Sequence, residues 1–207
     1  MNIAVFASGG GSNLQAIIDG CASGKIAARV CVVISNNSGS GALERAKAAG
    51  IPAVHLSAVR LAHSQNCESI SDAAHSPESD SSSLANEMLE TLRAHQTDIV
   101  FLAGYLKKIP DEVLAAFENR IFNIHPSLLP KFGGRGMYGI NVHTAVIAAN
   151  EPETGITIHR VTAEYDVGDI LAQRKVPVLP GDTPQALAAR VLEQEHIFLV
   201  EFLNEFK

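Results

Sequence analysis

An alternation of apolar segments with helical segments runs through the first 56 residues, and it constrains the fold more than any other feature. Residues 1–7, 28–34 and 51–56 are short and apolar, as is typical of buried parallel strands. Apolar residues at helical spacing occupy residues 14–19 and 41–49 between them. Because parallel strands need crossover connections, which are right-handed, this β-α-β-α-β order predicts a parallel sheet with helices packed on its faces.

The second half of the sequence adds strands of another kind. Residues 98–104 are again strongly apolar, and residues 120–124 form a further strand pattern. Residues 155–161 alternate between apolar and polar side chains, and residues 170–178 are extended, as is typical of hairpin strands. We therefore predict an α/β fold with a Rossmann-like, doubly wound and mostly parallel sheet that antiparallel C-terminal strands extend.

The chain length of 207 residues predicts one domain. Residues 57–83 interrupt the pattern, because Ser, His, Asn and Asp dominate there and no periodicity remains. This segment is expected to be an irregular surface loop or a poorly packed short helix. Helical periodicity resumes over residues 84–95.

Composition excludes several classes of function. The net charge is -6 and no basic cluster exceeds Lys107 and Lys108, which argues against nucleic acid as a partner. No apolar run approaches the roughly 20 residues that a membrane helix needs. The first strand pattern begins at once, without a leader, so a cytoplasmic protein is expected. Cys21, Cys31 and Cys67 lack metal-ligand spacing and are interpreted as reduced thiols.

A glycine-rich loop joins the first strand to the first helix. Free backbone N–H groups at such a helix start favour an anion. A dinucleotide fingerprint would need Gly where Leu14 stands, and the Gly-Lys-Ser/Thr of a P-loop is absent. A lone phosphate on Gly11, Ser12 and Asn13 fits better, and a tight turn with a serine N-cap is the alternative.

Asn123 lies near the end of the strand predicted at residues 120–124, and His125 follows this strand directly. Strand side chains alternate, so both point to the same side, and Pro126 ends the strand. In open α/β sheets ligands bind beyond this end of the strands. An amide can stabilise a developing oxyanion and an imidazole can move a proton, although two residues that cap nearby backbone remain the alternative.

Three further polar residues complete a candidate cluster with Asn123 and His125. Thr157 and His159 lie on one face of their strand, and Asp166 follows in an acidic loop. A carboxylate near an imidazole raises its pKa, and the set suits acyl transfer from one bound small molecule to the amine of another. Each residue alone is more often structural.

Other chemistries are disfavoured. There is no Gly-x-Ser-x-Gly elbow, and the cysteines lie far from these motifs. His125, His143 and His159 are distant in sequence and show no His-x-x-x-His spacing, so no metal site is predicted. Residues 130–139 contain four glycines and one arginine and are expected to form a loop over the crevice.

Four parts of the sequence carry a family resemblance: residues 8–17, residues 123–130, residues 155–159, and Asp166 with Gly168. Together they resemble the phosphoribosylglycinamide formyltransferase family, over nearly the whole chain apart from residues 57–83. The resemblance implies a formyltransferase fold in one domain, with residues 1–104 as a phosphate-binding half and residues 105–207 as a folate-binding and catalytic half. It implies formyl transfer from 10-formyltetrahydrofolate to glycinamide ribonucleotide in purine biosynthesis, without a metal.

The resemblance also implies catalytic roles. Asn123 and His125 would stabilise the tetrahedral intermediate on the formyl carbon, with His125 as proton donor. Asp166 would raise the pKa of His125 and assist proton movement. Thr157 and His159 would stand in a second layer behind these groups.

Binding roles follow from the same resemblance. Gly11, Ser12 and Asn13 would bind the ribose phosphate, and Glu195 would contact the sugar or the glycinamide part. Arg60 is the nearest candidate for an arginine on the folate side. The residues that would hold the pterin, largely through backbone groups, are Leu106, Lys107, Lys108, Ile109, Asn123, Thr162, Ala163, Glu164, Tyr165 and Asp166.

Several alternatives remain open. Leu192 stands where the family often has a polar substrate contact, so that part of the site departs from the pattern. A 10-formyltetrahydrofolate hydrolase would use water in place of the amine, although such relatives carry an additional N-terminal domain. Methionyl-tRNA formyltransferase would need a further C-terminal domain. A non-catalytic phosphosugar-binding module would keep its ligand after loss of His125. A monomer and a homodimer are both compatible with the sequence.

Overall fold

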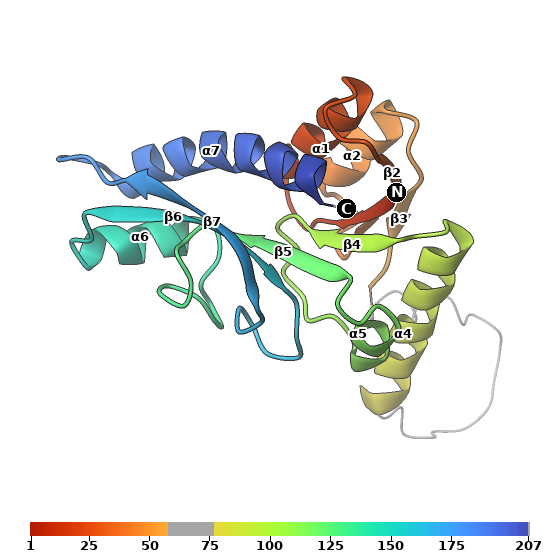
Figure 1. Cartoon of the computed structure of the whole chain (residues 1–207). Coiled ribbons are helices and arrows are strands. Elements are labelled where there is room, and N and C mark those ends of the chain that lie inside the picture. Colours follow the sequence, from red (N-terminus) through yellow and green to blue (C-terminus); the bar gives the residue numbers. More distant parts are fainter. Residues whose placement is uncertain (58–76, 207) are drawn as a thin grey trace.

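The structure, a computed structural model, describes residues 1–57 and 77–206 of the chain. Within these residues the strands form one seven-stranded sheet in the order β3-β2-β1-β4-β5-β6-β7 (Figure 1). Neighbouring strands from β3 to β5 are parallel, whereas β6 and β7 are antiparallel to their neighbours. This arrangement confirms the predicted α/β fold, including its antiparallel C-terminal extension.

The strands are β1 (Asn2–Phe6), β2 (Arg29–Ser35), β3 (Ala53–His55), β4 (Ile99–Leu102), β5 (Ile121–His125), β6 (Glu153–Arg160) and β7 (Ile170–Pro177). The described helices are α1 (Ser12–Ala22), α2 (Gly41–Ala48), α4 (Pro77–Ala94), α5 (Asp111–Ala116), α6 (Ile140–Ala148) and α7 (Pro184–Glu205). None of these helices is both long enough and apolar enough to span a membrane.

Two layers of helices bury the two faces of the sheet (Figure 1). Helices α1, α2, α6 and α7 contribute to the core on one face, and α4 and α5 to the core on the other. Strand β1 lies inside the sheet between β2 and β4, and its alternate side chains reach both cores: Ile3 and Val5 on one face, Ala4 and Phe6 on the other. The apolar strands of the sequence are therefore those covered on both sides.

Helix α4 begins earlier than the sequence pattern indicated. Residues 77–83, expected to be irregular, are helical, while residues 58–76 lie outside the described part of the chain. Proline suits the first turn of a helix, because its φ is preset and the missing N–H has no partner there. The irregular-loop alternative for residues 57–83 was therefore wrong for the last seven of these residues, which belong to an 18-residue helix.

The strand order places three chain segments at one edge of the sheet. β1, β4 and β5 are parallel, so their carboxyl ends lead into Ser8, Gly104 and Pro126 at the same edge. β6 runs antiparallel beside β5, and this brings His159 opposite Asn123. The edge is where an open α/β sheet binds ligands.

Candidate active site

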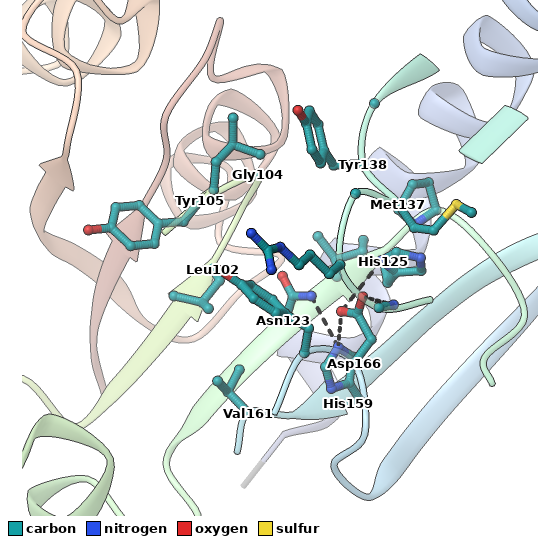
Figure 2. A pocket seen from close by; sticks show the side chains of 18 of the residues that line it. Leu102, Gly104, Tyr105, Asn123, His125, Met137, Tyr138, His159, Val161 and Asp166 are labelled. Carbon is teal, nitrogen blue, oxygen red and sulfur yellow. Dashed lines mark hydrogen bonds and ion pairs between the residues drawn. The ribbon is translucent and has the colours of Figure 1, made fainter. Parts of the chain in front are cut away.

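A cavity of about 780 Å³ opens at the carboxyl edge of the parallel strands (Figure 2). Its walls come from the ends of β4, β5 and β6, from the turn after β4, from the loop before α6, and from α7. Leu102, Ile109 and Val161 give the wall an apolar part, while Asn123, His125, His159 and Asp166 supply its polar part. A mostly apolar cavity with a few convergent polar groups is the usual form of a small-molecule site.

The pairing of β5 with β6 places the central polar side chains of the site. Asn123 pairs with His159 and His125 with Thr157, so side chains from both strands share one face of the sheet. The amide nitrogen of Asn123 lies 3.0 Å from Nε2 of His159. The sequence had predicted that Asn123 and His125 point the same way, and both line the cavity.

Thr157 supports the turn that follows His125 and does not itself line the cavity. Its hydroxyl donates to the carbonyl of Ser127 at 2.6 Å and accepts from the N–H of Leu129 at 3.0 Å. These bonds satisfy buried backbone groups directly after the strand, and so they hold the chain where it leaves β5.

Asp166 lies between the two imidazoles. Its Oδ1 is 3.6 Å from Nδ1 of His125 and 3.5 Å from Nε2 of His159, and its Oδ2 accepts from the N–H of Gly134 at 2.8 Å (Figure 2). The backbone of Asp166 adopts a φ of 57°, which turns the carboxylate inward from the loop after β6. The structure thus brings Asp166 together with His125 and His159, three of the five side chains in the candidate cluster.

A backbone carbonyl determines which ring nitrogen of His125 can accept and release a proton. Nε2 of His125 lies 2.8 Å from the carbonyl oxygen of Phe132, and a carbonyl can only accept, so Nε2 carries a hydrogen and donates it. Nδ1, which faces Asp166, is then the nitrogen that can gain or lose a proton.

Asp166 raises the pKa of His125, as the sequence predicted, but it does not decide the net direction. Burial lowers the pKa of His125 and outweighs the raising effects of Asp166 and of the Phe132 carbonyl, and His159 lowers it further. The ring therefore favours its neutral form. Burial by itself raises the pKa of Asp166, but His159, His125 and the Gly134 N–H together lower it below its usual value, so the carboxylate stays ionised.

Part of the predicted phosphate-binding loop lines the cavity, and part does not. Asn13 and Gly9 line the cavity, whereas Gly11 and Ser12 do not. Gly11 has a φ of 75°, and a side chain there would come within 2.7 Å of the backbone of Ala42 in α2. The N–H groups of the first turn of α1 have no partners inside the helix, which leaves them to an anion.

Glu195 meets Asn13 at the same end of the cavity. The amide nitrogen of Asn13 donates to Oε2 of Glu195 at 2.9 Å, while Oδ1 of Asn13 is buried without a partner among the described residues. Glu195 is only 6% exposed, and burial raises its pKa to about 7, against a smaller lowering by Asn13. A ligand hydroxyl or amine can form hydrogen bonds with both Oδ1 of Asn13 and the carboxyl group of Glu195.

The residues predicted to hold the pterin gather around the cavity. All of Leu106, Lys107, Lys108, Ile109, Thr162, Ala163, Glu164, Tyr165 and Asp166 line it. The ammonium of Lys108 lies 5.7 Å from the ring centre of Tyr165, so the two lining segments meet. Ser8 links this turn to the start of the phosphate loop, because its hydroxyl accepts from the N–H of Leu106 at 2.9 Å. Arg60 lies outside the described residues.

The sequence-based reasoning gave two of the lining residues no role in the site. His143 of α6 is only 4% exposed, and its Nδ1 is buried without a partner among the described residues. The signal was available, because His143 lies on the helix face that also buries Val142 and Val146. Arg135 is exposed and lines the cavity from the glycine-rich loop. Among residues 1–57 and 77–206, no group of three or more His, Cys, Asp or Glu is placed to hold a metal ion.

Comparisons with known proteins agree with this geometry. The family model described as formyl transferase matches residues 1–203. A chloroplastic phosphoribosylglycinamide formyltransferase of Arabidopsis thaliana is 44% identical over 98% of this chain, which spans 64% of that relative's length. The phosphoribosylglycinamide formyltransferase of Haemophilus influenzae is 41% identical, over 94% of this chain and 81% of its own.

Solved structures show the same architecture. Glycinamide ribonucleotide transformylase 1 from Symbiobacterium toebii superposes with a TM-score of 0.83 at 39% identity, covering 100% of this chain and 87% of its own. The chain therefore belongs to the formyl transferase family, among the phosphoribosylglycinamide formyltransferases.

Proposed function

We propose that this chain transfers the formyl group of 10-formyltetrahydrofolate to the amine of N1-(5-phosphoribosyl)glycinamide, a step of purine biosynthesis. The observation that carries the proposal is the meeting of Asn123, His125 and Asp166 in the wall of one cavity. The names of the relatives point to the same reaction.

The cavity offers different surroundings to the two substrates. Asn13 and Glu195 present buried hydrogen-bonding groups beside the first turn of α1, which suits a phosphorylated sugar. Leu102, Ile109 and Val161 present an apolar wall that suits a flat ring system, with backbone groups of the neighbouring loops in reach. These residues fit a folate as the formyl donor, and the phosphate and pterin assignments made from the sequence stay predictions.

The chemistry needs one proton to move between two nitrogens. The amine attacks the formyl carbon, a new C–N bond forms, and the bond from that carbon to N10 of the folate breaks. Nδ1 of His125, neutral at the start, takes the proton from the attacking nitrogen and returns it to N10. Asp166 stabilises the imidazolium in between, and an N–H of Asn123 stabilises the oxyanion.

A formyl-transfer assay with and without glycinamide ribonucleotide tests the proposal. The expected result is tetrahydrofolate release that depends on the amine substrate and forms one N-formyl product per turnover. Release at the same rate without the amine would instead identify a hydrolase. Binding of the ribonucleotide without any turnover would identify a phosphosugar-binding module.

Two further expectations belong to this proposal. The co-substrates are the partners that the site itself supports, and the choice between a monomer and a homodimer stays a prediction. The plant relative is named chloroplastic, so the cytoplasmic location expected from the sequence stays a prediction.

A further inference from the structure

His159 lines the cavity beside Asn123 and Asp166, is only 2% exposed, and contacts three different groups through its two ring nitrogens. Nδ1 lies 2.7 Å from the carbonyl oxygen of Arg160. Nε2 lies 3.0 Å from the amide nitrogen of Asn123 and 3.5 Å from Oδ1 of Asp166. The ring therefore stands between the residue that would stabilise the oxyanion and the residue that would stabilise the imidazolium.

The Arg160 carbonyl determines the tautomer of His159. A carbonyl oxygen can only accept, so Nδ1 carries the hydrogen and donates it. In the neutral ring Nε2 then has only a lone pair, and it accepts from the amide N–H of Asn123. The amide of Asn123 is thereby oriented, with one N–H bound to His159 and the second left for the cavity that Asn123 lines.

The two imidazoles are set in opposite tautomers around one carboxylate oxygen. Nδ1 of His125 and Nε2 of His159 lie 3.6 Å and 3.5 Å from Oδ1 of Asp166. The N–H of Asn123 already occupies Nε2 of His159, which leaves Nδ1 of His125 as the nitrogen available to the substrates.

We infer that His159 is a positioning residue for Asn123, an inference that rests on the proposed formyl transfer. By accepting a hydrogen bond at Nε2, His159 turns the second N–H of Asn123 toward the oxygen of the reacting formyl group. His159 acts through Asn123, and this role needs no contact with the reacting atoms.

A pair of substitutions separates this role from simple packing. Glutamine places its amide group near the position of Nε2, and asparagine places its amide group near the position of Nδ1, so H159Q can keep an acceptor for Asn123 while H159N cannot. We expect H159N to lower kcat by about 10²-fold, the cost of misplacing a reacting group, with KM for glycinamide ribonucleotide unchanged. The kcat of H159Q should be about tenfold higher than that of H159N.

Two controls keep the result specific. Ile158→Val trims a fully buried neighbour on the same strand, and its kcat should stay within about twofold of the wild type, as for a small loss of packing. In an Asn123→Ala background, H159N should add less than about twofold, because residues that act through one another are not additive. Equal losses in H159Q and H159N, or a change confined to KM, would overturn the inference.

Nitrogen NMR of the ligand-free wild-type protein tests the tautomers without any assay. The ¹⁵N shifts of His159 should show a protonated Nδ1 and a bare Nε2, with the signals assigned by their loss in H159Q. A protonated Nε2 would overturn the inference even if formyl transfer is observed. Absence of formyl transfer in the wild type would instead overturn the proposed function, whatever tautomer the ring shows.

Discussion

Gly133 lies directly against Asp166. A Cβ built on Gly133 would come within 3.2 Å of Cβ of Asp166 and within 2.5 Å of a methyl group of Leu129, which is itself buried. The next residue, Gly134, donates its N–H to the carboxylate of Asp166 at 2.8 Å, and the preceding Phe132 accepts from His125. Three consecutive residues of the glycine-rich loop therefore hold both the carboxylate and the imidazole.

Gly133→Ala should reduce turnover through this close approach. The added methyl group would meet a methyl group of Leu129 at 2.5 Å and Cβ of Asp166 at 3.2 Å, so these neighbours or the loop must shift. A misplacement of about 1 Å costs up to about 10²-fold in kcat, and a smaller shift costs less. Gly39→Ala is the matched control, since its added methyl would have only the Asn37 side chain nearby, at 3.8 Å. Steady-state kinetics of both variants provide the measurement, and equal activity in the two would show that the loop does not position Asp166.

The sheet and half of the site could be predicted because they follow from short-range regularities. Buried parallel strands are apolar along their length, which made Val5 and Phe101 recognisable as core residues. The two-residue period of a strand places Asn123 and His125 on one side without knowledge of the rest of the fold. The position of Ser8, two residues beyond the end of β1, follows from the same strand order.

The remainder depends on packing that no local pattern encodes. Asp166 approaches His125 from an irregular loop in which its own backbone takes a φ of 57°, so periodicity could not place it. The chemistry of a carboxylate near an imidazole and the family resemblance pointed to it. The raising effect of Asp166 on the pKa of His125 was predicted, but the larger lowering by burial was not, because the burial of that ring comes from distant parts of the chain. The start of α4 was missed because serine and aspartate are weak helix formers that packing can override.

His125→Ala should lower kcat by on the order of 10²–10⁴-fold, because the variant loses the group that accepts and returns the proton. Affinity for glycinamide ribonucleotide should change little, since the phosphate and sugar are expected to meet Asn13 and Glu195. Steady-state kinetics give the first quantity and titration calorimetry the second. Turnover equal to that of the wild type would remove His125 from the mechanism.

The pH dependence follows from the direction of the His125 pKa. Burial holds this pKa below its usual 6.5, so the working neutral ring predominates at neutral pH. We expect kcat/KM to fall as pH drops through the pKa of His125, and to be level above it until other groups titrate. Asp166→Asn removes an interaction that raises this pKa, so the acidic limb should move to lower pH while kcat decreases. A limb that moves to higher pH in this variant would contradict the assignment.

Glu195→Gln should change how stability depends on pH. Burial raises the pKa of Glu195 from 4.5 to about 7, so the folded protein holds a proton that the unfolded chain releases between these values. The stabilisation from this group is complete below about pH 4.5 and is lost as pH rises through about 7, by up to about 3 kcal/mol.

Glutamine is neutral throughout and can still accept from Asn13, so the free energy of unfolding of Glu195→Gln should increase relative to that of the wild type as pH rises. Urea unfolding of both proteins at pH 5 and pH 8 measures the difference, in which the histidines common to both cancel. Parallel stability curves would mean that Glu195 titrates alike in the folded and unfolded chains.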